Sequence, residues 1–526
     1  MQKQAIIRTL LILGILVLVN IISIKVFTRI DLTRNGMYTL APASKNLVKS
    51  LDDKFLIKAY FSSDLPSPYN NNRRYLQDEL DEYRAYSGGN FQYEFIDPDK
   101  TDELKQEAQR YGVQPVQVQV VKEDKFQMQL VYMGLIFIYG DKQERLPVVQ
   151  NLDNLEYEIS STMKKMTSKE LKKIGFLQGQ DEPKLDAMGQ LKEGLDKQYD
   201  VTTVDLTGGK AIPTDIAVLM VVAPDKPFKS WEKYLIDQYL MRGGRIAFLL
   251  NKVKMTLQSQ QGSPINLDLD DMLESYGVRV NTDLVRDARC ALVSVRQQEG
   301  FFVIQNQIPF YYLPNASDFS KTSPIVKDLS SVVFYFVSSL DTSFAKAKGL
   351  QVNMLVTSSK QAGRQESVFY INPTAQMTAD MFKESYIPLA VTVEGNFTSA
   401  FADKPVGLDS SVAMMVDTTR KVTNGVKSKI IVVGDGDFLQ DQFYGGNKDN
   451  IIFASNLVDY LADDIGLAAI RSREAQPKPL EEVSEGTRNL VKMADLGGPP
   501  ALIILFGIFR WRWRASMRKR LESRGL

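Results

Sequence analysis

The sequence contains no histidine and a single cysteine, Cys290. The lack of histidine excludes Ser-His-Asp and Cys-His hydrolases and histidine-ligated metal sites. One cysteine excludes disulfides within the chain, thiolate metal clusters and CxxC redox chemistry. Cys290 lies in the run RDARCALVSV, and we expect it to be a buried, small apolar residue. These absences favour a noncatalytic protein.

The chain also lacks a GxxxxGK[ST] motif and a surplus of basic residues. Without a P-loop, any energy from ATP must come from another subunit. The formal net charge of the 526 residues is +1, and the C-terminal tail supplies much of the positive charge. This balance gives no indication of a nucleic-acid partner. No cofactor is expected either.

Long apolar runs are present at both ends. Residues 5–27 form one, and residues 496–513 form a shorter one that is followed by a basic tail at 514–526. About 20 apolar residues span a bilayer as a helix, so we expect a transmembrane helix at each end. The alternative for the first run is a cleavable signal peptide, although no small-residue cleavage site follows it. The alternative for the second is an amphipathic helix lying on the membrane.

Large apolar and aromatic side chains are expected to anchor the two spans in the bilayer. They are Leu10, Leu16, Ile22, Leu502, Leu505, Trp511 and Trp513. Tryptophan interleaved with arginine at 510–514 is typical of a membrane interface. Pro499 and Pro500 suit the first turn of the second helix, where a missing N–H is harmless.

Basic residues near the membrane predict the orientation of the chain. The tail at 514–526 is strongly basic and is expected to be cytoplasmic. Two spans place both termini on the same side, so the body lies outside the cytoplasm. In a bacterium this means an inner-membrane protein with its main body in the periplasm.

The body begins with a pattern typical of a thioredoxin-like α/β domain over 30–168. After a first helix with Pro42 in its first turn, strands and helices are expected in the order β-α-β-α-β-β-α. The expected elements are strands at 54–61, 91–96, 116–121 and 130–139, and helices at 69–86, 101–111 and 154–166. The place of a redox CxxC reads DLPSPYNNN, so the domain has no redox cysteines.

Residues 170–465 alternate strands and helices, which predicts a doubly wound parallel sheet. Strands are expected at 173–177, 201–206, 216–222, 245–250 and 429–433, with helices at 183–198, 230–241 and 450–461. A less regular stretch at about 252–425 is expected to be a β-rich insertion. Residues 466–495 are polar and rich in proline and charge, and are predicted to be a stalk.

Two turns after strands carry polar groups at the carboxyl edge of this sheet, where α/β proteins usually bind ligands. The first contains Gln178, Gln180 and Glu182, and the second contains Asp435 and Asp437. Together these five form our candidate ligand-binding site. Two carboxylates two residues apart suit a hard cation. The alternative in both places is a turn that starts and caps the next helix.

The order of several segments resembles that of bacterial auxiliary proteins of ABC transporters. They are IDLTRNGMYTLAPASKNLVKSL, FQYEFIDPDK, LEYEISSTMKKMT, KIGFLQGQDEP, RGGRIAFLLN and IIVVGDGDFLQD. The order is most similar to that of gliding-motility-associated members from Bacteroidota. The resemblance implies a separate ATPase subunit, a multi-span permease and envelope or motility proteins as partners. It also implies that the second domain is amidotransferase-like and related to intraflagellar-transport domains.

An amidotransferase carries a nucleophilic cysteine at a sharp turn after a strand, and this chain reads LLNKVK at that place. The expected function is therefore a noncatalytic, membrane-anchored accessory subunit of an ABC-type complex. The alternatives are a metal-dependent enzyme that uses Asp435 and Asp437, or a ligand-binding receptor that uses the edge around Gln178–Glu182.

Overall fold

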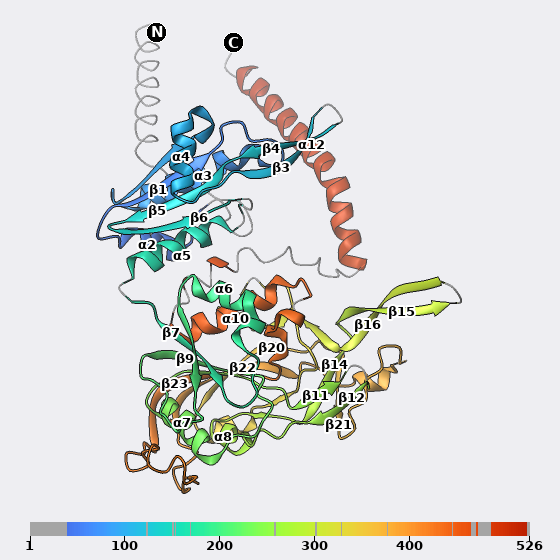
Figure 1. Ribbon diagram of the computed structural model, residues 1–526. Coiled ribbons are helices and arrows are strands. Elements are labelled where there is room, and N and C mark those ends of the chain that lie inside the picture. Colours follow the sequence, from blue (N-terminus) through green and yellow to red (C-terminus); the bar gives the residue numbers. More distant parts are fainter. Residues whose placement is uncertain are drawn as a thin grey trace. The chain divides into compact units, whose positions relative to one another are not determined.

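The computed structural model describes residues 39–522, apart from 123–124, 150–151, 153, 169, 257–258, 300–301, 328, 376, 444, 464–465, 467–469 and 472–484. The chain divides into two compact units, Met1–Gln476 and Pro477–Leu526. The N-terminal apolar run, with Leu10, Leu16 and Ile22, lies outside the described residues. Within the first unit we distinguish a first lobe, residues 39–168, and a second lobe, residues 170–471 (Figure 1).

The first lobe is built on a mixed sheet with the strand order β2-β1-β5-β6. β1 pairs in parallel with β2 and antiparallel with β5, and β5 pairs antiparallel with β6. The strands are β1 Phe55–Phe61, β2 Phe91–Ile96, β5 Met133–Tyr139 and β6 Lys142–Leu146; the helices are α2 Pro42–Lys49, η1 Tyr69–Asn71, α3 Asn72–Tyr86, η2 Pro98–Lys100, α4 Asp102–Arg110 and α5 Leu155–Thr167.

Helices cover both faces of this sheet. Phe55, Ile57 and Ala59 of β1 lie in a core with residues of α2, α3 and α5. Tyr60 points to the other face and packs in a smaller cluster with Ala108 of α4. Side chains alternate across a strand, so β1 contributes to both cores.

One part of the first lobe differs from the prediction. The expected strand at 130–139 is two strands, and its first part belongs to a separate hairpin of β3 (Val116–Lys122) and β4 (Lys125–Val131). β3 therefore pairs with β4 rather than joining the main sheet. The fourth sheet strand is β6, whose sequence KQERL has no apolar alternation and so gives no strand signal.

The second lobe contains a larger mixed sheet with the order β17-β20-β22-β23-β10-β9-β7-β8. The strands from β23 to β8 run parallel, and β22, β20 and β17 continue the sheet antiparallel. Their bounds are β7 Lys173–Gln178, β8 Asp200–Asp205, β9 Ile216–Val222, β10 Ile246–Leu249, β17 Asp318–Phe319, β20 Gln351–Thr357, β22 Pro388–Thr398 and β23 Asn424–Val433.

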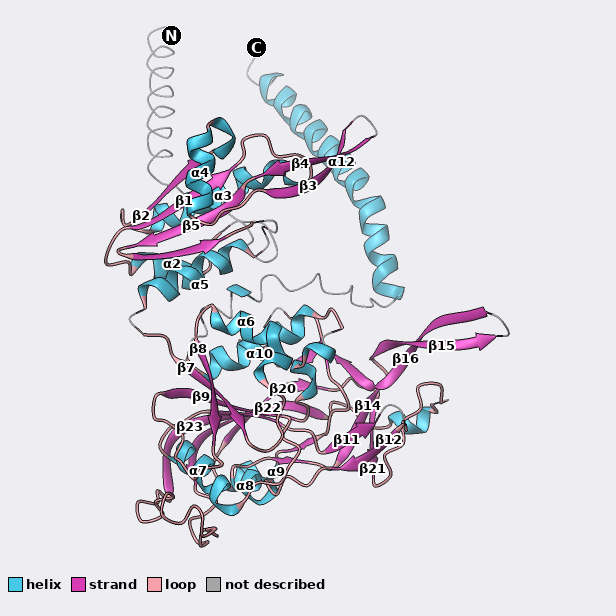
Figure 2. Ribbon diagram, viewed as in Figure 1, coloured by secondary structure: helices cyan, strands magenta, loops and turns pink. Residues whose placement is uncertain are grey.

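Helices lie on both faces of the parallel strands (Figure 2). α6 (Gly189–Asp196) and α10 (Lys448–Leu461) pack on one face, and α7 (Ser230–Met241) and α8 (Asp270–Ser275) on the other. Val218 and Met220 of β9 belong to the core under α6 and α10, whereas Leu219 and Val221 belong to the core under α7. An apolar run buried on both sides explains the sequence IAVLMVV.

The region predicted to be a β-rich insertion lies between β10 and β23. β17, β20 and β22 from this region extend the main sheet, and the hairpin of β15 and β16 projects from the lobe (Figure 1). The remaining elements of the lobe are η3 Leu185–Met188, β11 Val253–Thr256, β12 Gln261–Pro264, β13 Arg279–Val280, β14 Asp283–Asp287, β15 Cys290–Glu299, β16 Phe302–Ala316, β18 Val332–Val333, β19 Leu340–Asp341, α9 Ser343–Ala347, β21 Ala362–Glu366, η4 Ala379–Phe382, η5 Asp437–Leu439 and η6 Asp441–Phe443.

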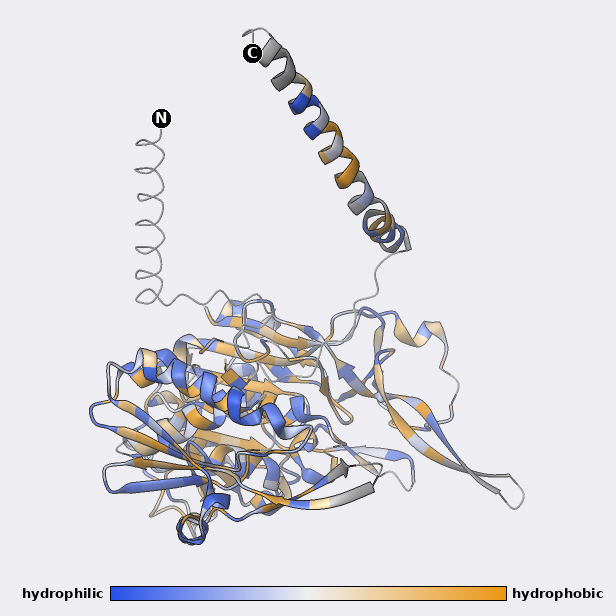
Figure 3. Cartoon of the chain, turned by 90° about the horizontal axis from the view of Figure 1, so that it is seen from above, coloured by the Kyte–Doolittle hydropathy of each residue, from blue (hydrophilic) through white to orange (hydrophobic). Residues whose placement is uncertain are grey.

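The described residues of the second unit form one long helix, α12, over Glu485–Glu522. Its stretch Asn489–Ala515 is long and apolar enough to cross a membrane, by length and composition. Figure 3 shows apolar residues grouped along this helix. The expected start at Pro499 is wrong, because Pro499 and Pro500 lie well inside the helix. Helix-forming residues upstream, such as those of NLVKMADL, extend the helix toward its N-terminus.

Candidate functional site

The two turns predicted as a ligand site follow β7 and β23. In the parallel part of the sheet the order is β23-β10-β9-β7-β8. The chain enters the sheet at β7, adds β8 on one side and then adds β9, β10 and β23 on the other side. The strand order therefore reverses between β7 and β9. α/β proteins of this kind bind ligands outside the carboxyl ends of the strands at such a reversal. The loop Gln178–Glu182 lies at this point, and Gly434–Gln440 lies at the end of β23.

Gln178 does not point outward from the sheet edge. Its side-chain amide donates hydrogen bonds to the carbonyl oxygens of Leu177 (2.9 Å) and Pro183 (3.1 Å). The amide therefore closes its own turn rather than presenting a donor to a ligand.

Gln180 and Glu182 close the crevice between β7 and β9. The carbonyl oxygen of Gln180 accepts the backbone N–H groups of Asp225 (2.9 Å) and Lys226 (3.1 Å), which follow β9. Oε2 of Glu182 accepts the N–H of Gln180 at 2.7 Å, and burial raises the pKa of the Glu182 carboxyl. The two loops are thus hydrogen-bonded across the position that a ligand occupies in many α/β proteins.

Asp435 is fully buried, and its carboxylate is satisfied by backbone donors. Oδ2 accepts the N–H of Tyr335 at 2.6 Å, and Oδ1 accepts the N–H of Asp437 at 2.7 Å. Burial and the neighbouring Asp437 raise the pKa of Asp435 well above its ordinary value. Asp435 therefore fastens the segment at Tyr335 to the turn after β23.

Asp437 lies beside Asp435 at the same edge. The side-chain amide of Gln440 donates to its Oδ1 at 2.8 Å. Burial raises the pKa of Asp437 to about 6. A hydrogen bond with Asn251 lowers this pKa, whereas the negative charge of Asp225 raises it further. Asp225 in turn pairs with Lys254. Asp437 is thus held by Gln440 and Asn251 and lies within the electrostatic reach of Asp225.

The glycines of the Gly-Asp-Gly-Asp motif are explained by close packing of the backbone. A Cβ atom at Gly434 would lie 1.9 Å from the carbonyl oxygen of Ser338. One at Gly436 would lie 2.7 Å from the backbone nitrogen of Ala223 and 2.7 Å from the carbonyl oxygen of Leu249. The motif is therefore required for the fit of the turn between neighbouring strands.

The structure thus brings Gln180, Glu182 and Asp437 to one edge of the sheet, near Asp225. Gln178 bonds within its own turn, and Asp435 bonds to the backbone of its turn and of the segment at Tyr335. Across the residues that the structure describes, no group of three or more Asp, Glu or Cys side chains is arranged to hold a metal ion. Cys290 is half-buried, and burial raises the pKa of its thiol to about 11.

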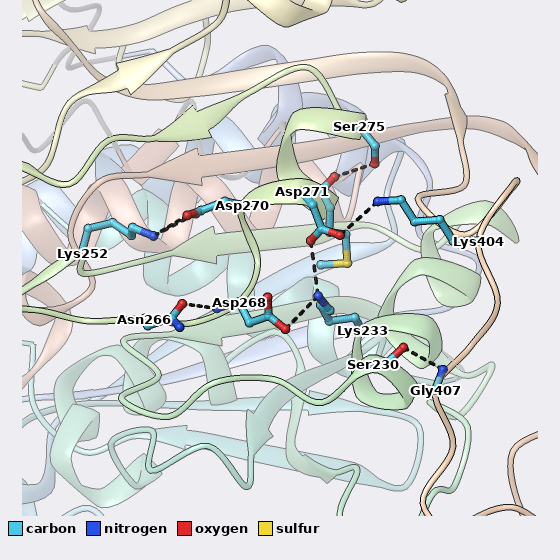
Figure 4. A network of polar contacts seen from close by, with 11 residues as sticks. Ser230, Lys233, Lys252, Asn266, Asp268, Asp270, Asp271, Ser275, Lys404 and Gly407 are labelled. Atoms are coloured by element: carbon cyan, nitrogen blue, oxygen red, sulfur yellow. Dashed lines mark hydrogen bonds and ion pairs between the residues drawn. The ribbon is translucent and has the colours of Figure 1, made fainter.

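A network of lysines and aspartates ties α8 to its neighbours (Figure 4). Lys233 of α7 has a side chain that is 8% exposed and pairs with Asp268 (3.1 Å) and Asp271 (3.3 Å). Lys252 contacts both oxygens of Asp270, at 2.8 and 3.0 Å. Each of these lysines is balanced by a carboxylate of the same network, which indicates a structural role.

Sequence reasoning did not single out a second polar cluster, which lies between the two lobes. We call it the lobe joint and define it by Tyr157, Gln198, Asp459 and Arg471. Arg471 is buried, and its guanidinium contacts Asp459 at 2.9 Å and the hydroxyl of Tyr157 at 2.7 Å. The hydroxyl of Tyr157 also accepts a hydrogen bond from the side-chain amide of Gln198.

The lobe joint connects segments that are far apart in the sequence. Tyr157 belongs to α5 of the first lobe, Gln198 follows α6, Asp459 lies on α10, and Arg471 follows α10. Tyr199 donates to the second oxygen of Asp459 at 2.7 Å. Burial works to lower the pKa of Arg471, but Asp459 and Tyr157 raise it, so the guanidinium stays charged. The arginine inside a polar run was the only sequence signal for this cluster.

An apolar contact lies next to the lobe joint. Ala41, Tyr157 and Ile470 form a buried cluster, with Ala43 packed against it. A Cβ atom placed on Gly466 would lie 3.0 Å from the Cβ of Ala43. The beginning of α2 and the segment after α10 therefore meet on the same helix, α5. Ile470 and Arg471, near the beginning of the expected stalk at 466–495, are thus buried in the body.

The predicted anchoring residues of the second span are on α12. The side chains of Leu505, Trp511 and Trp513 are 62%, 70% and 62% exposed. Apolar side chains exposed along a helix of this length are what a bilayer would cover. Leu502 also lies on α12.

Comparison with known proteins gives the family. Residues 171–462, more than half of the chain, match the family model described as "ABC-type uncharacterized transport system". Residues 34–138 match a domain of unknown function (DUF7088). An uncharacterized protein of Borreliella burgdorferi is 24% identical over 503 residues, which cover 93% of this chain and 94% of that protein.

Among solved structures, the "mmIFT52 N-terminal domain" is 14% identical and covers 55% of this chain and 97% of its own, with a TM-score of 0.32. On the match over residues 171–462, the chain belongs to the ABC-type uncharacterized transport system family.

Proposed function

We propose that this protein is a noncatalytic, membrane-anchored accessory subunit of an ABC-type transport complex. The family match over residues 171–462 is the observation that carries the proposal. It is supported by α12, whose stretch Asn489–Ala515 is long and apolar enough to cross a membrane. An accessory role in a transport system follows from the family; the membrane anchoring at both ends is our proposal.

The geometry of the sheet edge supports a noncatalytic role. Across the crevice between β7 and β9, the carbonyl oxygen of Gln180 accepts hydrogen bonds from two backbone N–H groups of the loop after β9. Asp435 uses its two carboxylate oxygens to hold backbone N–H groups. A catalytic carboxylate must face a substrate or a reactive water, and Asp435 faces its own loops.

The strand orders support the finer fold assignments made from the sequence. In the first lobe, β1 and β2 are parallel and β5 and β6 follow antiparallel, in the order β2-β1-β5-β6. We infer a thioredoxin-like domain with an added hairpin, β3–β4. The parallel sheet of the second lobe, with helices on both faces, supports a doubly wound, amidotransferase-like domain.

The partners in this proposal are an ABC ATPase subunit and a multi-span permease. The chain carries no GxxxxGK[ST] motif, so ATP hydrolysis belongs to another subunit. We place both termini in the cytoplasm and the two lobes in the periplasm of a bacterial inner membrane. The complex would support envelope transport or gliding motility, in which movements of the permease reach the lobes through the two anchors.

Purification from the native membrane tests this proposal. The tagged full-length protein is extracted in mild detergent, and the accompanying proteins are identified by mass spectrometry. We expect a stoichiometric ATPase and a permease. The matched control is a chain that lacks residues 496–526, which should lose these partners. A full-length protein that purifies without partners from gently solubilised membranes would contradict the proposal.

A further inference from the structure

Two successive residues of α5, Glu156 and Tyr157 of the lobe joint, hold the segment at the start of α2 and the segment after α10. Oε1 of Glu156 accepts the backbone N–H of Ala41 and the hydroxyl of Ser44, each at 2.6 Å. The next residue, Tyr157, accepts a hydrogen bond from Arg471 at 2.7 Å. α5 therefore fastens the segment at the start of α2 and the segment after α10.

Arg471 also connects the two lobes. Its guanidinium reaches Tyr157 of the first lobe, and it contacts Asp459 and Asn456 of α10 in the second lobe at 2.9 and 3.1 Å. Asp459 is fully buried and Arg471 is nearly so. A buried charge that is paired in this way is costly to separate, so the contact acts as a fixed link.

A second ion pair crosses the same boundary. Lys197, which follows α6, contacts Glu158 of α5 at 2.7 Å. Glu156, Tyr157 and Glu158 are thus three successive residues that hold, in turn, the start of α2, the segment after α10 and the end of α6. Such a concentration of long-range contacts on one turn of α5 marks it as the element that joins the lobes.

We propose that the lobe joint is a mechanical coupling, through which load on either end of the body reaches the contact between the two lobes. The proposal rests on the proposed function, in which both ends of the chain are held in a membrane. Because the two ends meet on α5, they move as one attachment point. Arg471 then passes the load into the second lobe through Asp459.

A disulfide across the joint tests whether its two segments stay together. The variant carries Ala43→Cys and Gly466→Cys with Cys290→Ser, as a full-length chain in its native membrane. A Cβ at Gly466 would lie 3.0 Å from that of Ala43, and a disulfide needs about 3.8 Å, so a small shift suffices. The control pair is Ala43→Cys with Gly208→Cys, since a Cβ at Gly208 has no atom within 4 Å.

We expect the joint pair to cross-link at least about tenfold more than the control pair under mild oxidation. Cells that carry the oxidised joint pair should behave like the parent, since the coupling is fixed. Equal cross-linking of the two pairs would overturn the proposal. Loss of function on oxidation, restored by a reductant, would also overturn it, because the joint would then have to open.

A second measurement follows the coupling between the lobes. Spin labels at Glu103→Cys and Ser410→Cys, in the Cys290→Ser background, report the distance between the lobes in full-length protein in nanodiscs. Both positions are exposed. Tyr157→Phe keeps the ring but removes the acceptor for Arg471 and Gln198.

We expect Tyr157→Phe to widen the distance distribution at least about twofold, because the link across the lobes loses its hydrogen bonds. The matched control is Tyr83→Phe, whose hydroxyl bonds to Ser160 and Glu156 within the first lobe. This variant should keep the parental distribution. Equal distributions for Tyr157→Phe and the parent would contradict the proposal. The cross-linking yield and the distance distribution need no partner protein, so a failed co-purification leaves these two readouts interpretable.

Discussion

Two buried aspartates of the second lobe illustrate different uses of a carboxylate. Asp435 and Asp459 are both fully buried. Asp435 accepts backbone N–H groups within its own lobe, whereas Asp459 pairs with the charged side chain of Arg471, which continues to Tyr157 of the first lobe. The contacts of Asp435 stabilise loops within the second lobe, whereas the pair of Asp459 with Arg471 connects the two lobes. The sheet edge looks like a ligand site in the sequence, and the lobe joint gives no motif at all.

The largest expected effect comes from breaking the joint. Arg471→Met leaves Asp459 buried with one partner lost, and should lower the apparent free energy of unfolding by about 3–5 kcal/mol. Urea denaturation of the full-length protein in detergent, followed by circular dichroism, measures it. Lys383→Met, which removes an exposed pair with Asp380, is the control and should leave the transition unchanged. A similar small change for both variants would contradict a coupling role for Arg471.

The next largest expected effect is a difference in stability between variants of Asp435 and Asp437, the two aspartates of the sheet edge. Asp435→Asn replaces an acceptor oxygen by an amide that faces a backbone N–H, and should destabilise the protein by about 1–3 kcal/mol. Asp437→Asn retains an acceptor for Gln440. At about pH 3, where Asp437 is protonated in the folded and the unfolded state, it should change the free energy of unfolding by less than about 1 kcal/mol. The same denaturation series measures both variants. A larger loss for Asp437→Asn would reverse the assignment of Asp435 as the structural member.

The pH dependence of stability sharpens the same distinction. The pKa of Asp437 is raised from 3.8 to about 6 in the folded protein, so the folded state binds this proton more tightly. Its contribution to stability is present below the unfolded value and is lost as the pH rises toward 6. Asp437→Asn should therefore flatten the decline of stability in this window by about 3 kcal/mol. Unfolding at a series of pH values, compared with the parent, measures it; identical profiles would contradict the raised pKa.

The smallest expected effect concerns two tyrosines. Tyr157→Phe and Tyr83→Phe should each lower the free energy of unfolding by about 1 kcal/mol, since each loses a buried hydroxyl. Combined with Arg471→Met, Tyr157→Phe should add almost nothing, whereas Tyr83→Phe should be additive. A double-mutant cycle on unfolding measures the coupling. Additivity in both cycles would show that Tyr157 and Arg471 do not act together.

Much of the fold follows from hydrophobic patterns. The strand at 216–222 and the helix at 230–241 match β9 and α7 at both ends, because a buried run and a helical period are strong local signals. β6 was missed because its residues are polar. The strand expected at 116–121 is confirmed as β3, but its pairing with β4 in a separate hairpin could not be predicted, because the period of a single strand does not encode its partner.

The site was predictable only in part. The turns after β7 and β23 lie at one sheet edge, as strand order requires. The sequence does not show which of their polar groups bond within the chain, nor that Oε1 of Glu182 is buried there without a hydrogen-bond partner among the described residues. The lobe joint depends on contacts such as that of Arg471 with Tyr157, which are 314 residues apart. An arginine in a polar run is usually solvated, so nothing local marks Arg471 as buried.

The central claim is that this protein works through the lobe joint and its membrane-attached ends, and that the sheet edge is structural. The most direct test is complementation of cells that lack the gene, with the variants at equal protein levels by immunoblot. The account predicts that Asp437→Asn restores the parental phenotype and that Tyr157→Phe does not. Restoration by Tyr157→Phe together with failure of Asp437→Asn would contradict it.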